Sequence, residues 1–474
     1  MVRTPAQVNP KVRSMLTIPG NRTSRFCDGV SRRSFLRIGS LGLGSVALPG
    51  LLSQQATAAS GSQTRSVVMI YLPGGPTQHE TFDPKPDAPS EIRGSFGPVS
   101  TNVPGVQFCE LLPRLSRMAD RFSVVRTLVG LENRHESFQC YTGRPGGRNE
   151  DSEPAGGWPT FGSVASSVLG PGRNGMVPFV DASPHMNYAP YRNQGLHDAS
   201  TKISWPGFTG PTHVPFALEG DVRPDLVLNG IDSARLNRRR ELLSSLTDIQ
   251  RQIEGAGSDS FLKQAFGLLT AGQLAEALNL DAEPAQVRER YGVSQPTASG
   301  FGGAPQSPRH LLLTRRLVEA GVRCVTVAFG AWDWHGNRGG TVEYLSRKYL
   351  PVFDQAVSVF LQDLDERGLL ATTTVIVWGE FGRTPRINPK GGRDHWPGTQ
   401  SVLLAGGSVH GGRIVGKTDR VGGFPVERPV HVQEVFATLY GHLGIDTNNV
   451  KITDLNGRPR YLVDGNRQPI SELM

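Results

Sequence analysis

Cysteine is scarce in this chain, and that limits how the fold can be held together. The 474 residues include four cysteines, of which Cys27 lies near the N-terminus and Cys109, Cys140 and Cys324 lie farther along. If the N-terminal segment is removed, as argued below, three cysteines remain and one disulfide at most can form. The chain must then be held by a hydrophobic core, and about 415 residues suffice for one large domain or two.

Net charge is also scarce outside the first 59 residues. The whole chain carries a formal net charge of +8. Residues 1–59 contain eight Lys or Arg residues and one acidic residue, Asp28, so this segment contributes +7 and the remainder about +1. The basic isoelectric point therefore does not indicate nucleic-acid binding, and we expect no nucleic-acid partner. The sequence also lacks internal repeats and a glycine motif of the nucleotide-binding kind.

The first 59 residues have the pattern of a twin-arginine export leader. Residues 31–37 read Ser-Arg-Arg-Ser-Phe-Leu-Arg, a glycine-broken apolar stretch follows at 38–52, and residues 56–58 are Ala-Thr-Ala. The apolar stretch is too short and too interrupted for a spanning helix. We therefore expect the twin-arginine export machinery as a partner, a periplasmic or extracellular location, and no stable membrane span after cleavage. An uncleaved anchor is the alternative.

Residues 60–474 alternate between short buried strands and helices, which predicts one α/β domain. Strands are expected at 66–72, 122–129, 177–180, 323–329, 373–378 and 401–404. Helices are expected at 111–119, 158–169, 231–253, 261–280, 310–320, 349–367 and 432–443. Buried strands alternating with helices imply a mostly parallel or mixed sheet covered on both faces. Residues 183–307 form a loop-rich and helical insertion in this scheme.

Polar side chains gather where the expected strands end. Thr77 and His79 follow the first strand, and the later strand ends are followed by His135, Ser137, Asp333, His335, Glu380, Asp394 and His395. Ligands of open α/β sheets bind beyond the carboxyl ends of the strands, so we expect these residues to meet at one rim. The alternatives are backbone-capping turns, a surface histidine at 135, and an ion pair of Glu380 with Arg383 or Arg393.

These residue types favour a metal centre. Carboxylates combined with imidazoles suit zinc, manganese or iron, whereas ligation by oxygen alone suits calcium or magnesium. We predict a divalent metal (zinc, manganese or calcium) held by His79, Asp333, His335, Glu380, Asp394 and His395. His135 would assist catalysis. Arg383 would contact the oxygens of a sulfate or phosphate, which a guanidinium fork matches.

Four motifs carry a resemblance to a known family. They read GGPTQHETFDPKP at 74–86, WDWHGN at 332–337, WGEFGRTPRIN at 378–388 and GGRDHWP at 391–397. With the leader, they resemble an exported family catalogued as domain of unknown function number fifteen-oh-one and often labelled sulfatase-like. The resemblance covers essentially the whole chain after the leader. It implies an alkaline phosphatase-like three-layer sandwich, metal ligands at strand carboxyl ends, and hydrolysis of sulfate or phosphate esters, either small molecules or polysaccharide.

The sequence also departs from the sulfatase pattern to which that family is similar. Sulfatases end the first strand in paired aspartates, where this chain has Gly74 and Gly75. They carry Asp-His after the late strand, where this chain has Glu380-Phe381. The segment 140–144 has Thr where formylglycine formation needs Pro or Ala, so we predict no formylglycine.

The nucleophile is left open by these departures. Thr77, Ser137 or a metal-bound hydroxide could serve. The sequence therefore predicts an exported metal-dependent hydrolase of sulfate or phosphate esters. A non-catalytic exported binding or scaffold protein on the same fold is the alternative.

Overall fold

The centre of the fold is β1 (Ser66–Tyr71), a strand of six fully buried residues. In this computed structural model it pairs in parallel with β7 (Cys324–Ala328) on one side and with β8 (Thr373–Trp378) on the other. Its β-branched residues suit a strand that is covered on both faces. The structure describes residues 65–135, 137–146, 151–184, 205–218, 273–292, 303–337 and 340–474.

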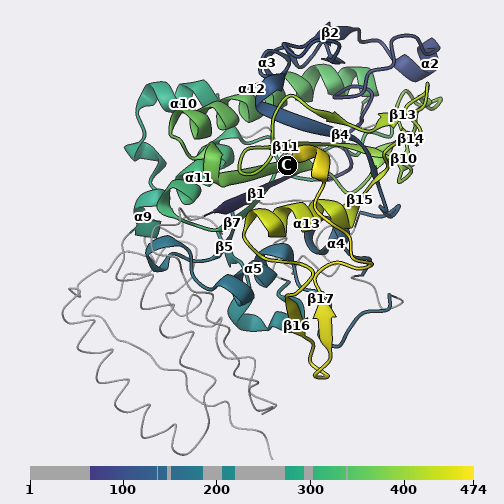
Figure 1. Ribbon diagram of the computed structural model, residues 1–474. Coiled ribbons are helices and arrows are strands. Elements are labelled where there is room, and N and C mark those ends of the chain that lie inside the picture. Colours follow the sequence, from purple (N-terminus) through teal and green to yellow (C-terminus); the bar gives the residue numbers. More distant parts are fainter. Residues whose placement is uncertain are drawn as a thin grey trace, which may run out of the picture. The chain divides into compact units, whose positions relative to one another are not determined.

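The described residues extend β1 into a nine-stranded sheet with the order β12-β4-β11-β8-β1-β7-β5-β6, in which β15 also pairs with β4 (Figure 1). The remaining strands are β4 (Phe122–Val129), β5 (Phe179–Asp181), β6 (Phe216–Ala217), β11 (Gln400–Ala405), β12 (Ile414–Val415) and β15 (Val430–His431). Only β11 among them runs antiparallel to its neighbours, β8 and β4. The carboxyl ends of β4, β8, β1, β7 and β5 therefore lie at one edge, and the start of β11 lies there too.

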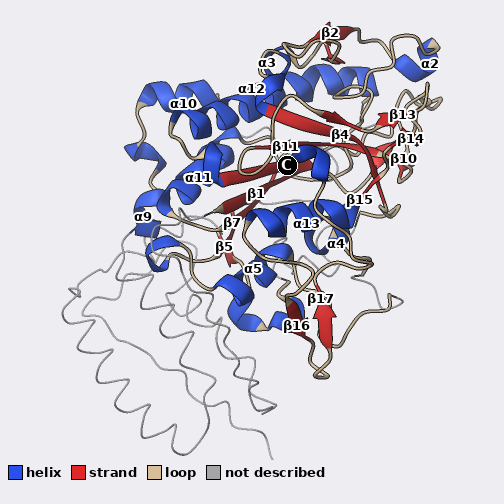
Figure 2. Cartoon of the chain, in the orientation of Figure 1, coloured by secondary structure: helices blue, strands red, loops and turns tan. Residues whose placement is uncertain are grey.

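Helices cover both faces of this sheet (Figures 1 and 2). One face carries α4 (Phe138–Thr142), α5 (Phe161–Leu169) and α13 (Val432–His442), and the other carries α10 (Ala285–Tyr291), α11 (Pro308–Ala320) and α12 (Val342–Glu366). Shorter helices are α2 (Ser90–Arg93), α3 (Pro113–Ser116) and α9 (Gln273–Ala277). This arrangement confirms the expected three-layer α/β fold.

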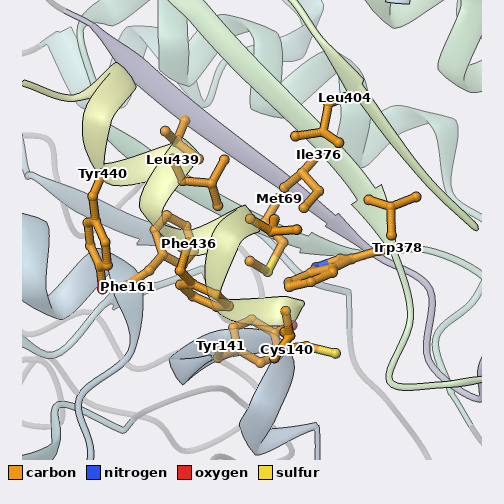
Figure 3. Close-up of a cluster of buried hydrophobic side chains, with 14 of the residues drawn as sticks. Met69, Cys140, Tyr141, Phe161, Ile376, Trp378, Leu404, Phe436, Leu439 and Tyr440 are labelled. Carbon is orange, nitrogen blue, oxygen red and sulfur yellow. The ribbon is translucent and has the colours of Figure 1, made fainter. Parts of the chain in front are cut away.

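The core under α13 explains why these layers stay together. Met69 of β1 and Trp378 of β8 point to this face and pack with Phe436 of α13, whose ring centroid lies 5.8 Å from that of Trp378 (Figure 3). Neighbouring strand residues alternate between faces, so Val68 and Ile70 face the opposite helical layer. Replacing a buried aromatic ring such as that of Phe436 with alanine costs about 3–5 kcal/mol.

Several expected elements agree with the structure, and others lie outside its described residues. The strands expected at 122–129 and 373–378 have the predicted bounds. Helix α12 begins at Val342 rather than at 349, because Thr341 accepts a hydrogen bond from the Tyr344 N–H and caps it there. The leader at 1–59 and the helix expected at 231–253 lie outside the described residues.

The described residues all belong to one compact unit, Thr57–Arg223 with Ala271–Met474. Cys109, Cys140 and Cys324 are all buried and free of disulfides. No helix among the described residues is both long enough and apolar enough to cross a membrane.

Candidate metal centre

The site lies at the edge where the parallel strands end. The loop after β4 carries His135, the loop after β7 carries Asp333 and His335, and the loop between β8 and β11 carries Glu380 and His395. These loops meet because β11 is antiparallel, so its first residue lies at the edge where β8 ends. Ligand sites of α/β sheets lie at this edge.

Asp333 is the point on which three histidines converge. Its carboxylate is 5% exposed, and its Oδ1 lies 2.9 Å from Nε2 of His335 and 3.1 Å from Nε2 of His395. Its Oδ2 lies 3.5 Å from Nε2 of His135. The three histidines come from three separate loops, and each presents the same ring nitrogen to the same carboxylate.

The other nitrogen of each histidine is held by a side-chain oxygen. Nδ1 of His135 lies 2.8 Å from Oε1 of Glu380. Nδ1 of His335 lies 2.8 Å from Oδ1 of Asp394. In the same way, Nδ1 of His395 lies 3.0 Å from Oδ1 of Asn133. An oxygen on Nδ1 fixes the ring and leaves Nε2 as the free donor atom, which is the usual environment of metal-binding histidines.

The spacing of these atoms fits one bound cation. Ligand atoms of His135, Asp333 and His395 all lie within 4.8 Å of one another. Two ligands at about 2.0–2.1 Å from a tetrahedral zinc ion are about 3.3 Å apart, close to the carboxylate–histidine distances above. The Nε2 atoms of His335 and His395 lie only 2.9 Å apart, which requires a proton or a cation between their lone pairs. Three imidazoles and a carboxylate suit zinc or manganese better than calcium, which prefers oxygen.

Neighbouring charges and burial together shift the pKa values of Asp333, His135 and His395. Burial by itself lowers the pKa of His135, but its hydrogen bonds to Asp333 and Glu380 outweigh burial and raise the pKa to about 9. Burial raises the pKa of Asp333, yet its contacts with the histidines and Arg383 hold the pKa well below its usual range. The pKa of His395 is lowered by burial and by the charge of Arg383. The carboxylate thus stays ionised, and a divalent cation would compete with protons for the imidazoles.

The loop after β1 has a conformation that only glycine suits. Gly74 has φ +105°, and a Cβ at this position would lie 2.4 Å from the backbone nitrogen of Asp333. The Gly74 N–H donates a 2.8 Å hydrogen bond to Oε1 of Glu380. The glycine therefore lets the first loop approach Asp333 closely and also orients the carboxylate that holds His135.

Arg383 lies beside Asp333 but is turned into the protein. It is 1% exposed. Its Nε donates to the carbonyl of Gly75 at 2.9 Å, its Nη1 to the carbonyl of Arg393 at 2.9 Å, and its Nη2 to the carbonyl of Gly74 and, at 2.6 Å, to Oδ1 of Asp333. A buried guanidinium has to satisfy its donors, and here backbone carbonyls do so. Arg383 thus links the strand-end loops that carry Gly75, Arg393 and Asp333 through hydrogen bonds. The sequence predicted that it contacts a ligand anion.

Thr77 and His79 lie in a different set of contacts. The Thr77 hydroxyl donates a 2.5 Å hydrogen bond to Oε2 of Glu80, whose carboxylate pairs with the buried Arg393 at 2.5 Å. Nε2 of His79 lies 2.7 Å from the carbonyl oxygen of Val421. In the part of the chain that the structure describes, no hydrogen bond or ion pair joins Thr77 or His79 to Asp333. Thr77 is tied instead to the buried Glu80–Arg393 pair.

Two hydroxyls lie next to Glu380. The Tyr71 hydroxyl donates to Oε2 of Glu380 at 2.9 Å and lies 2.5 Å from Oγ of Ser137. Ser137 and Glu380 line a small cavity of about 10 Å³, together with Arg134 and neighbouring residues. A cavity of this size has room for about one water molecule.

The sequence pattern predicts that Asp333, His335 and His395 lie together, but it does not reveal two further residues of the site. An amide such as Asn133, two residues before a histidine, carries no distinctive signal. Tyr71 ends an apolar strand, which is the position of a core residue. The one feature of the sequence that points to Asn133 and Tyr71 is their position at or just after the end of a strand. Many residues that take no part in a site share this position.

The sequence matches one family model, described as "Protein of unknown function (DUF1501)", over residues 64–474. No curated protein matches the sequence.

Solved structures of three kinds of protein are similar in fold at low identity. A sulfatase from Pseudoalteromonas sp. is 11% identical with a TM-score of 0.35, over 81% of this chain and 68% of that one. A phosphonate monoester hydrolase from Silicibacter pomeroyi is 12% identical with a TM-score of 0.35, over 81% and 73%. The lipoteichoic acid synthase LtaP from Listeria monocytogenes is 8% identical with a TM-score of 0.33, over 85% and 87%. Likeness at this level concerns the arrangement of strands and helices alone.

Proposed function

The chain belongs to the DUF1501 family, whose description assigns no activity, and we propose that it is an exported metal-dependent hydrolase of sulfate or phosphate esters. One observation carries the proposal: three histidines from three loops direct Nε2 at Asp333, and each has its Nδ1 held by a side-chain oxygen. Such orientation of several imidazoles toward one carboxylate serves metal binding better than it serves stability.

In this proposal His135, Asp333, His335 and His395 hold a divalent cation, with zinc or manganese the best match to the donor atoms. Glu380 and Asp394, which the sequence predicted as ligands, instead orient His135 and His335 through contacts with their Nδ1 atoms. The bound cation would supply Lewis-acid stabilisation of charge on the ester oxygens.

The opening of the cavity beside Glu380 is the proposed place of the ester head group. The cavity itself has room for about one water molecule, so the head group would lie at its opening, where the Ser137 hydroxyl is the candidate acceptor of the transferred group. The rest of the substrate, whether a small molecule or a polysaccharide, would extend outside. The twin-arginine pattern at 31–37 supports export.

A non-catalytic binding protein is the second candidate, and one observation favours it. Arg383, the arginine beside Asp333, donates to backbone carbonyls and to Asp333. Arg134, which lines the cavity, is paired with Glu132 and Asp151. A substrate anion would then depend on the cation for its charge complement.

Elemental analysis and enzyme assays of the purified protein test the proposal together. We expect about one zinc or manganese per chain and turnover of aryl sulfates or aryl phosphates that a chelator abolishes. His395→Ala should lose both metal and turnover, Glu380→Gln should weaken both, and Arg386→Gln, whose side chain is 71% exposed, should change neither. Metal binding without turnover of either ester class would favour the binding protein. Retention of metal by both site variants would contradict the ligand set.

A further inference from the structure

Tyr71 and Tyr141 are two buried tyrosines in contact that differ in what their hydroxyls do. Their ring centroids lie 5.4 Å apart in an edge-on arrangement, and both side chains are fully buried. The Tyr71 hydroxyl contacts Ser137 and Glu380. The Tyr141 hydroxyl is buried with no hydrogen-bond partner among the described residues. The Tyr71 hydroxyl therefore contacts residues of the site, and the Tyr141 hydroxyl does not.

The hydrogen bonds around Tyr71 hold the Ser137 hydroxyl in one place. The Tyr71 hydroxyl donates to Oε2 of Glu380, and a tyrosine hydroxyl has one proton to donate. Ser137 Oγ lies 2.5 Å from the Tyr71 oxygen and donates to the carbonyl of His135 at 3.1 Å, so its one proton has two acceptors within reach, of which Tyr71 is the nearer. Lone pairs of Ser137 Oγ are left for the small cavity that it lines.

The backbone of Ser137 supports a role for its hydroxyl. Ser137 has φ +49°, a left-handed conformation that is uncommon for a residue with a side chain. It immediately precedes α4, where serine usually accepts a hydrogen bond from the helix backbone, but its side chain makes no such bond. The hydroxyl instead contacts Tyr71 and the carbonyl of His135. Backbone strain of this kind tends to occur at functional sites.

We propose that Tyr71 is a positioning residue that sets the Ser137 hydroxyl for attack, and that it couples this hydroxyl to His135 through Glu380. The inference rests on the proposed function, because it takes Ser137 as the acceptor. In the transfer step, Ser137 Oγ bonds to the phosphorus or sulfur, the bond to the ester oxygen breaks, the Ser137 proton passes to Tyr71 as the Tyr71 proton passes to Glu380, and the departing alkoxide takes a proton from water. Without the Tyr71 hydroxyl, the carbonyl of His135, to which Ser137 Oγ already donates at 3.1 Å, remains its one hydrogen-bond partner among the described residues.

A covalent probe tests this inference without need of ester turnover. Diisopropyl fluorophosphate forms an Oγ–P bond with a reactive serine while the P–F bond breaks and fluoride leaves. We expect labelling of Ser137, identified by peptide mass spectrometry and absent in Ser137→Ala. Tyr71→Phe should slow the labelling about 10- to 100-fold, since misorientation of a reacting group has effects of this size. The control Tyr141→Phe should label within about twofold of the unchanged protein.

Thermal melts and metal analysis of both tyrosine variants separate positioning from a general structural effect. Tyr71→Phe should stay folded with the same metal content, and where the protein turns over an ester, kcat should fall while KM stays constant. Equal labelling of Tyr71→Phe and the unchanged protein would overturn the inference, as would labelling at a residue other than Ser137. Tyr71-dependent labelling in a protein that hydrolyses no sulfate or phosphate ester would support the inference while the proposed function fails.

Discussion

Glu80 with Arg393 and Asp333 with Arg383 are two buried carboxylate–arginine pairs carried by strand-end loops. In the first, Arg393 and Thr77 donate to both oxygens of Glu80, and the nearby His79 turns to a backbone carbonyl. In the second, Arg383 donates to only one oxygen of Asp333, and three histidines approach the carboxylate. Both clusters pair a buried carboxylate with a buried arginine. They differ in the number of imidazoles that point at the carboxylate, and this number distinguishes a candidate ligand site from a structural ion pair.

The pKa values of His79 and His135 are shifted in opposite directions. Burial and the charge of Arg393 lower the pKa of His79 to about 4. The pKa of His135 is instead raised to about 9, because the contacts with Asp333 and Glu380 outweigh burial. His79 therefore stays neutral in the folded chain, although its buried Nδ1 has no hydrogen-bond partner among the described residues. His135 lies between two carboxylates, which attract a proton or a cation.

The largest expected effect comes from the carboxylate at the centre of the site. Asp333→Asn should abolish stoichiometric binding of zinc or manganese, because it removes the charge on which three histidines converge. Isothermal titration of the chelator-treated protein measures the loss. Glu343→Gln, a change at an exposed carboxylate, is the control and should bind as before. Unchanged affinity in Asp333→Asn would show that the cation binds elsewhere.

In the other cluster, Glu80→Gln should reduce stability and leave metal binding intact. It leaves the fully buried guanidinium of Arg393 without its anionic partner, which costs about 3–5 kcal/mol. Urea unfolding measures the cost, and Glu91→Gln, in a surface pair with Arg386, should cost less than about 1 kcal/mol. A loss of metal without a loss of stability in Glu80→Gln would reverse the roles assigned to the two clusters.

His79 should make the fold sensitive to mild acid. Its pKa is about 4 in the folded chain and about 6.5 in the unfolded chain, so the unfolded state binds a proton first as the pH falls. The stabilisation is complete above pH 6.5 and is lost progressively toward pH 4. Between pH 7.5 and pH 5 this amounts to about 2 kcal/mol. The unfolding free energy of His79→Gln should lack this component, and equal pH dependence of both proteins would contradict the assignment.

The smallest expected effect concerns Asp394, which holds His335 at the exposed side of the centre. Asp394→Asn should weaken metal binding about tenfold, the lower end for a residue that orients a ligand, because its side chain is 54% exposed. In a His335→Ala background the same change should have no further effect, since the histidine it orients is gone. Additive losses in the double variant would mean that Asp394 acts on the cation independently of His335.

The sequence predicted which edge of the sheet carries the site but not the direction of each side chain. Asp333, His335 and His395 follow buried strands, and the rule that ligands bind at strand carboxyl ends brought them together. The same rule predicted that His79 joins them, whereas its Nε2 lies against the carbonyl of Val421. This contact and the nearby Glu80–Arg393 pair join residues that are far apart in the sequence, so no local pattern predicts them.

Ligand roles were also divided differently from the prediction. His135 was expected to assist catalysis, and its Nε2 faces Asp333 with the other two histidines. Glu380 and Asp394 were expected to bind metal, and they contact the histidines instead. The residue types in a sequence motif indicate what kind of ligand a cluster can bind. Which side chain contacts which depends on tertiary packing, and a short motif does not contain that information.

Anomalous diffraction from crystals of the zinc-loaded protein locates the bound cation itself. We expect a zinc peak about 2.0–2.2 Å from an oxygen of Asp333 and from Nε2 atoms of the surrounding histidines. A fully loaded protein with its zinc peak at any other place, or with no peak beside Asp333, would contradict this prediction.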